Sequence, residues 1–316
     1  MQAKTVSVGP VTAAVGNQVA ASQTPYAGQV ILNGVGGTFS INNVATAQDP
    51  AGAGNLTLVS SPVSFTTPRY LYITSAANDT TITFTVTGID VNGAPLVEAI
   101  TGANTKARAS VNRFSVVSNI AVSGNSGSIQ VGSFDGASFT GSTARQVTIT
   151  SGGSDESGKT FVVTGTNVMG ARVSEAITGP GAGLTVTTST YFLTVTSVTV
   201  SADTTGAITV GMTATATSPW VRFDDFAPSN ISIQCNVTGS ATYTVQSTLD
   251  DPFDPFSPVS TAAMTWVASS DANVVGATTT KQSNFLFAPK FARVVLTAVS
   301  TGSVAATFLQ SSNGPK

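Results

Sequence analysis

Few side chains in this sequence can do chemistry at neutral pH. The chain has no histidine and a single cysteine, Cys235. Ser-His-Asp and Cys-His nucleophile arrangements need a histidine base, and many zinc sites need a histidine ligand. No G-x-x-x-x-G-K-[ST] phosphate loop occurs, and the glycine-rich stretches 34–37 and 179–183 precede no predicted helix. We therefore expect no catalytic residue, no cofactor site and no enzymatic activity.

The acidic residues show one local concentration. Two short segments hold five of the 15 acids: Asp224, Asp225, Asp250, Asp251 and Asp254. Calcium takes roughly six to eight oxygen ligands, and these carboxylates could supply some of them, although their spacing is not that of an EF-hand. Aspartate before proline favours turns in which the carboxylate accepts hydrogen bonds from backbone amides. We predict turns and no metal ligand, with a calcium site as the alternative.

The lone cysteine lies in an alternating sequence. Ile231, Ile233, Cys235 and Val237 share one face of a predicted strand. A single cysteine can form no intrachain disulfide, and without a histidine partner it lacks the usual activating base. We predict that Cys235 is a small buried core residue.

Composition excludes several kinds of partner. Lys and Arg number 13 against 15 Asp and Glu, the pI is near 5.0, and the basic residues form no cluster. Direct binding to nucleic acid needs a basic surplus that this chain lacks. No apolar run approaches the roughly 20 residues that cross a bilayer, and no secretory h-region follows the start. We expect a protein made in the cytosol, with no membrane contact.

The elements that position these residues are predicted to be β-strands. Alternation with a period of two dominates, as at 70–74, 81–87 and 194–200, and no long helical stripe is present. Turn formers separate the runs, and Asn92-Gly93 is typical of a tight hairpin. The abundance of Val, Ile and Thr favours folding despite a charged content of only 9%. The sequence predicts an all-β protein.

An internal repeat divides the chain. Glu98–Gly102 (EAITG) returns as Glu175–Gly179, a displacement of 77 (175 − 98). Other matches follow in the same order, from Arg69 and Arg145 onwards, and the displacement grows slowly as loop insertions would make it grow. We interpret 58–134 and 135–216 as two homologous β-sandwich-like domains.

The flanking segments differ from the repeats. Residues 1–57 are rich in Gly, Ala and Asn. They indicate either a small irregular subdomain or an arm that orders on a neighbouring subunit. Residues 217–316 contain six or seven predicted strands and both tryptophans, Trp220 and Trp266, which suggests one larger core in an antiparallel sandwich or jelly roll.

The low charge has a consequence for assembly. Monomeric β-proteins protect their sheet edges with charges, especially Lys, and with Pro. Only 28 residues of 316 are charged here (13 + 15), so we expect neighbouring chains to cover some edges. A surface of Thr, Ser, Val and Ala suits broad contacts between subunits. A homo-oligomer is therefore predicted, with a trimer favoured.

The repeated sequence and part of the C-terminal segment resemble a sequence pattern in virion proteins of tailed bacteriophages. The residues that carry the resemblance are 73–75, 84–93 and 98–102, their second copy through 189–200, and the C-terminal stretch 239–252. The resemblance covers about two thirds of the chain and implies a structural protein of the virion, without catalytic residues. It names a particle component and not a role within the particle.

Three functional hypotheses follow. The first is a capsid decoration or cementing protein that contacts the major capsid protein across subunit junctions. The second is a head fibre or a tail or neck accessory protein that touches the host surface, including host glycans. The third is a bacterial adhesin, which the absence of a secretion signal disfavours.

Overall fold

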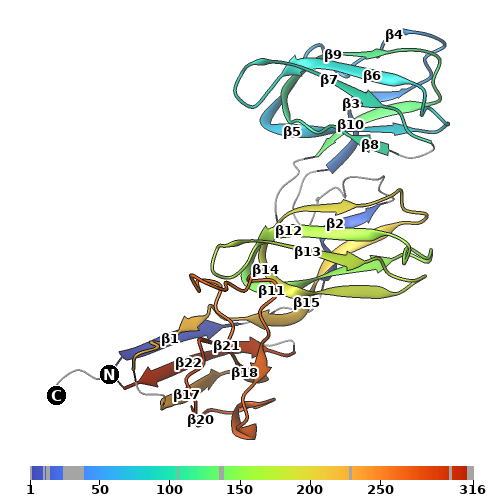
Figure 1. Cartoon of the computed structure of the whole chain (residues 1–316). Helices are drawn as coiled ribbons and strands as arrows, with labels where there is room; N and C mark the ends of the chain where they lie inside the picture. The colour runs from blue at the N-terminus through green and yellow to red at the C-terminus, as the bar shows by residue number, and fades with distance from the viewer. Residues whose placement is uncertain are drawn as a thin grey trace.

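A computed structural model describes residues 2–9, 11, 15–23, 39–104, 107–134, 139–227, 230–298 and 301–311. Within these ranges the chain forms antiparallel strands and one short 3-10 turn, η1 (Ala272–Val274), and contains no α-helix. The prediction of an all-β protein built from antiparallel sheets is confirmed. Figure 1 shows three β-lobes arranged one after another, which we call the first, second and third lobe in the order of their main sequence segments.

The first lobe is one curved sheet around a largely aliphatic core that includes two phenylalanines. Its main path is β3-β10-β5-β9-β6-β7. Phe84, Phe114 and Ile120 have no exposed surface in this core. Alternate residues of β6 face the core, as the period of two predicts. The strands are β3 (Phe39–Gln48), β4 (Gly54–Asn55), β5 (Val63–Ser75), β6 (Thr83–Ile89), β7 (Pro95–Thr101), β8 (Ala107–Ala109), β9 (Phe114–Val122) and β10 (Ile129–Phe134).

The second lobe has the same strand order. Its path is β2-β15-β11-β14-β12-β13, which corresponds element by element to the path of the first lobe. Its core contains Phe161 and Phe192 at the places of Phe84 and Phe114. The strands are β2 (Val15–Gln23), β11 (Phe139–Ser151), β12 (Thr160–Thr166), β13 (Arg172–Thr178), β14 (Thr185–Val200) and β15 (Ile208–Thr217).

The repeated glycines lie where two strands approach too closely for a side chain. A Cβ atom on Gly88 would stand 2.0 Å from the carbonyl oxygen of Val116. In the second lobe a Cβ atom on Gly165 would stand 1.9 Å from the carbonyl oxygen of Thr194. Both distances are far inside van der Waals contact, so only glycine fits at either position.

The repeated glutamate stabilises a loop in each lobe. Glu98 accepts hydrogen bonds from the backbone amides of residues 111–112, at 2.6 and 3.0 Å. Glu175 accepts the corresponding bonds from the amides of residues 189–190, both at 2.7 Å. The repeated residues therefore make matching loop and strand contacts in the two lobes.

The third lobe is an antiparallel sandwich. One sheet has the order β1-β22-β17-β20, and it faces β16, β21, β18 and β19 across a core that includes Phe308, Tyr243 and Val294. Residues 216–217 of β15 pair with β21, so one sheet continues from the second lobe into the third. The strands are β1 (Gln2–Val8), β16 (Val221–Arg222), β17 (Ile231–Thr238), β18 (Tyr243–Thr248), β19 (Val267–Ala268), β20 (Lys281–Phe285), β21 (Phe291–Leu296) and β22 (Ser303–Gln310).

The prediction that residues 1–57 are irregular or form a separate arm is wrong for the described part of this segment. Here β1 pairs with β22 of the third lobe, β2 with β15 of the second, and β3 with β10 of the first. The segment is rich in Gly, Ala and Asn. A strand added to an existing edge nevertheless receives hydrogen bonds and packing from its partner. The sequence also predicts a short strand at 30–32, but residues 24–38 lie outside the described residues.

Candidate functional site

The lone cysteine lies in the core of the third lobe. Cys235 has no exposed surface, like Ile231 and Ile233 on the same face of β17. Burial raises the pKa of its thiol to about 11, and the neighbouring Tyr243 hydroxyl opposes this only in part. The thiol is therefore protonated at neutral pH and inaccessible to reagents, which is unsuited to nucleophilic chemistry.

The predicted acidic group forms turns. Asp254 accepts hydrogen bonds from the amides of Phe256 and Ser257, at 2.8 and 2.9 Å. These bonds hold the pKa of its carboxyl below the ordinary value. Asp251 accepts a bond from the amide of Phe253 at 2.8 Å. The aspartates before proline thus bond to the backbone two or three residues on.

Two cations pair with Asp225 and Asp251 of the acidic group. The Lys290 Nζ lies 2.8 Å from Asp225 and 4.0 Å from Asp251. Arg222 lies 3.4 Å from Asp251 on the same side. The described residues contain no group of three or more side chains arranged to hold a metal ion. The structure therefore brings part of the predicted group together, but around Lys290.

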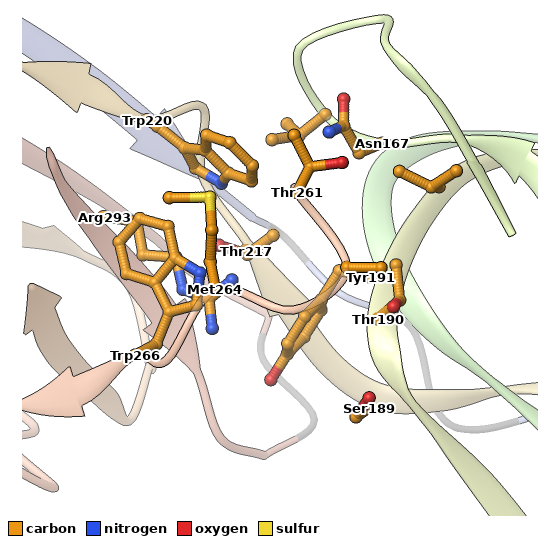
Figure 2. A pocket seen from close by; sticks show the side chains of 13 residues that line it. Asn167, Ser189, Thr190, Tyr191, Thr217, Trp220, Thr261, Met264, Trp266 and Arg293 are labelled. Carbon is orange, nitrogen blue, oxygen red and sulfur yellow. The ribbon is translucent and has the colours of Figure 1, made fainter. Parts of the chain in front are cut away.

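A cavity at the junction of the second and third lobes has a chemically distinctive lining. Its volume is about 80 Å³. Its lining comes from the β12–β13 turn, β13, β14, β15, β21, the loop before β19 and Trp220, which precedes β16. Figure 2 shows the two tryptophans, Met264 and Arg293 on one side and Asn167 and the 189–191 segment on the other. Trp220 and Trp266 lie 5.3 Å apart between ring centroids. The prediction that they belong to a larger core is wrong: both are half-buried and line this cavity.

A buried arginine is the central charge of the cavity. Arg293 on β21 is only 8% exposed, and its guanidinium lies 4.1 Å from the Trp266 ring centroid and 5.0 Å from that of Tyr191. Its Nε donates to Gln246 Oε1 at 2.9 Å. No described carboxylate lies within ion-pair distance of it. Burial lowers the pKa of Arg293 to about 10, so it is charged at neutral pH.

Two further donors in the lining have no acceptor. The indole Nε1 of Trp220 and the amide Nδ2 of Asn167 are buried and form no hydrogen bond. Buried donors are normally satisfied, and leaving one unsatisfied costs roughly 1–3 kcal/mol. No Asp or Glu lines the cavity. Its lining therefore offers unsatisfied hydrogen-bond donors and positive charge without a carboxylate.

Asn167 distinguishes the second lobe from the first. Its Oδ1 accepts bonds from the amides of Met169 and Ala171, at 2.9 and 3.1 Å. At the corresponding turn of the first lobe, Asp90 accepts the same pair of bonds from Asn92 and Ala94, at 2.7 and 2.9 Å. Either residue therefore forms the turn, but only the amide of Asn167 adds a donor that faces a cavity.

A second feature of the third lobe is an exposed apolar surface. We use the name apolar surface for seven exposed side chains of the third lobe: Phe226, Leu249, Phe253, Phe256, Val267, Leu286 and Phe287. Leu249, Val267 and Phe287 line one open hollow of about 370 Å³ beside the edge strand β19. The loops that carry the other phenylalanines are brought together by the bonds of Lys290 to Asp225 and Asp251.

Comparison with known proteins adds little. No protein-family model matches the chain, and no curated protein matches it. Among solved structures, the chain is similar to one described as "The Triple Jelly Roll Fold and Turret Assembly in an Archaeal Virus". The two are 13% identical, the match covers 84% of this chain and 89% of the other, and the TM-score is 0.19. A TM-score this low does not establish a common fold.

Among the described residues no helix is long and apolar enough to cross a membrane.

Proposed function

We propose that this protein is a non-enzymatic structural component of a tailed-bacteriophage particle, and that it decorates or cements the capsid. It acts by covering surface on its neighbours, which include the major capsid protein and further copies of itself. A homotrimer is the favoured oligomer. The resemblance of its repeats to virion proteins of tailed phages supports this role, as does the scarcity of charged residues.

The observation that carries the proposal is the apolar surface of the third lobe. Phe226 and Phe256 are 90% and 95% exposed, and such side chains are costly to leave in water. Several exposed apolar side chains on neighbouring loops, such as those that Lys290 holds together through Asp225 and Asp251, are typical of protein interaction sites. The apolar surface therefore serves as the contact with the particle.

Binding to undecorated particles tests this role. Phe226→Ser combined with Phe256→Ser should abolish co-sedimentation with particles, because both side chains supply contact area and little support to the fold. The matched control is Val97→Ser with Val111→Ser, which removes exposed apolar side chains from the first lobe. The control should bind as the wild type does. Binding of the double phenylalanine variant at wild-type affinity would exclude the apolar surface as the contact.

A head fibre or tail accessory protein is the second candidate. The arrangement of three lobes in line favours it, because an extended molecule projects from a particle. Particles that lack the protein separate the two roles. Loss of heat resistance with normal adsorption to cells favours cementing, and loss of adsorption with normal heat resistance favours the accessory role. Light scattering on the purified protein measures the oligomer.

A further inference from the structure

We propose that the cavity between the second and third lobes binds a carboxylate group, presented by an acidic saccharide such as a uronic acid. Three features of the lining carry the inference: the buried Arg293, the unsatisfied donors of Trp220 and Asn167, and the absence of any lining Asp or Glu. The inference does not depend on the role of the protein in a particle.

The charge of the lining selects an anion. Arg293 is held between the rings of Trp266 and Tyr191, so its position is fixed before any ligand arrives. Its Nε donates a hydrogen bond to Gln246 Oε1. Its two terminal nitrogens have no carboxylate partner among the described residues. A guanidinium binds a carboxylate through two parallel hydrogen bonds, and that geometry suits its terminal nitrogens.

The rest of the lining indicates that the molecule bearing the carboxylate is a sugar. Trp220 Nε1 and Asn167 Nδ2 are donors that an acceptor-rich group can satisfy. Hydroxyl groups of Thr190, Thr217 and Thr261 also border the cavity, and the tryptophan pair adds an apolar wall. Aromatic faces beside polar groups suit a sugar ring, which has apolar C–H faces and a polar edge. A cavity of about 80 Å³ admits the carboxylate group, so the sugar ring that carries it lies at the cavity opening.

Intrinsic fluorescence reports directly on this cavity. The chain has only two tryptophans, and both line the cavity. Excitation of tryptophan alone therefore follows occupancy in the intact protein without any label. Glucuronate should change the emission in a saturable way, acetate should do so more weakly, and glucose, which lacks the carboxylate, should have little effect.

One substitution removes the donor and keeps the turn. Asn167→Asp retains the oxygen that accepts the bonds from Met169 and Ala171, as Asp90 does in the first lobe. It replaces the free amide with a negative charge, which should weaken glucuronate binding by roughly tenfold or more. The matched control is Asp90→Asn, which makes the reverse change in the first lobe and should leave binding unchanged. Arg293→Lys, which keeps the charge and loses the bidentate geometry, should also weaken binding.

The outcomes are distinct. Saturable binding of glucuronate that Asn167→Asp weakens and Asp90→Asn preserves supports the site. The absence of any response to glucuronate or acetate would mean that the cavity holds water only. Equal responses to glucose and glucuronate would overturn the choice of an anion. Unchanged glucuronate binding by folded Asn167→Asp protein would overturn the role of the cavity donors. Particle binding is measured separately, so failure here leaves the proposed function intact.

Discussion

At the scale of single residues, the repeated text is explained by packing and turn formation. Gly88 and Gly165 stand against a carbonyl oxygen of the neighbouring strand, and Glu98 and Glu175 bond to loop amides. At the two glycines, any larger residue would collide with the neighbouring strand. At the two glutamates, a residue without a carboxylate would leave the loop amides without an acceptor. Their recurrence in both lobes is therefore a structural property.

We predict that Gly165→Ala destabilises the protein by about 1–3 kcal/mol, because the new methyl group would overlap the Thr194 carbonyl oxygen and force the strands apart. Urea unfolding followed by circular dichroism measures the change. Gly158→Ala is the matched control, because a Cβ atom there meets nothing within 4 Å. An equal loss of stability in both variants would contradict the close-approach explanation.

The buried thiol predicts a pH dependence. The pKa of Cys235 rises from about 9 in the unfolded chain to about 11 in the folded one, so the folded state retains its proton longer. This contribution is constant below pH 9 and is lost as the pH rises from 9 to 11. Cys235→Ala should flatten the curve of unfolding free energy between pH 9 and 10. The raised pKa of Tyr243 should still lower stability above pH 10.

The acidic group predicts an absence of metal dependence. Its carboxylates already bond to backbone amides, Arg222 and Lys290, so the melting temperature should not change when a calcium chelator is added. Differential scanning fluorimetry with and without chelator provides the measurement. A drop of many degrees would reveal a tight calcium site, since a ligand bound only by the folded state stabilises it.

At the scale of elements, β1 completes both the sheet and the core of the third lobe. β1 covers the edge of β22 along its whole length, from Gln2 opposite Gln310 to Val8 opposite Val304. Val8 is buried in the core of the sandwich, whereas its neighbour Ser7 is exposed. The strand therefore both protects an edge and fills the core.

We predict that Val8→Asp detaches β1 and destabilises the third lobe by about 2–4 kcal/mol, because a buried carboxylate without a partner is costly. Hydrogen exchange of the β22 amides measures the detachment. Ser7→Asp places the same charge one residue earlier on the solvent side and should leave exchange unchanged. Normal protection of β22 in the Val8→Asp protein would show that β1 is not held through Val8.

The elements also show what the sequence could and could not predict. The alternation from Ile231 to Val237 predicts a strand, and β17 spans Ile231–Thr238, because one buried face imposes a period of two. The pairings of β1, β2 and β3 were not predictable, because alternation identifies a strand and not its partner. The cavity escaped prediction for a related reason: Asn167, Trp266 and Arg293 are far apart in sequence and meet only at the lobe junction.

At the scale of the whole molecule, the N-terminal segment links all three lobes. It contributes β1 to the third, β2 to the second and β3 to the first before the rest of the chain builds the lobes in the opposite order. The second and third lobes are therefore each completed by a strand from outside their own main sequence segment. The cores of the second and third lobes are further joined by the pairing of β15 with β21.

We predict that deletion of residues 1–23, which removes β1 and β2, lowers the thermal stability of the second and third lobes and spares the first. Calorimetry should then resolve an early transition that is absent from the full-length protein. Limited proteolysis followed by mass spectrometry identifies which lobes open first. Deletion of residues 312–316, which follow β22, is the control and should leave the melting profile unchanged. Early cleavage in the first lobe of the 1–23 deletion protein would contradict this account.

The pairing of β1 with β22 also sets the order of events during biosynthesis. β1 is translated long before the strand that pairs with it, because Gln2 lies opposite Gln310, about three hundred residues later in the chain. Closing so distant a contact is slow, and the third lobe cannot finish before translation has passed β22. The apolar surface lies on the third lobe, so under the proposed function a chain arrested before β22 would lack a finished contact with the particle. The third lobe is thus complete only after translation has passed β22.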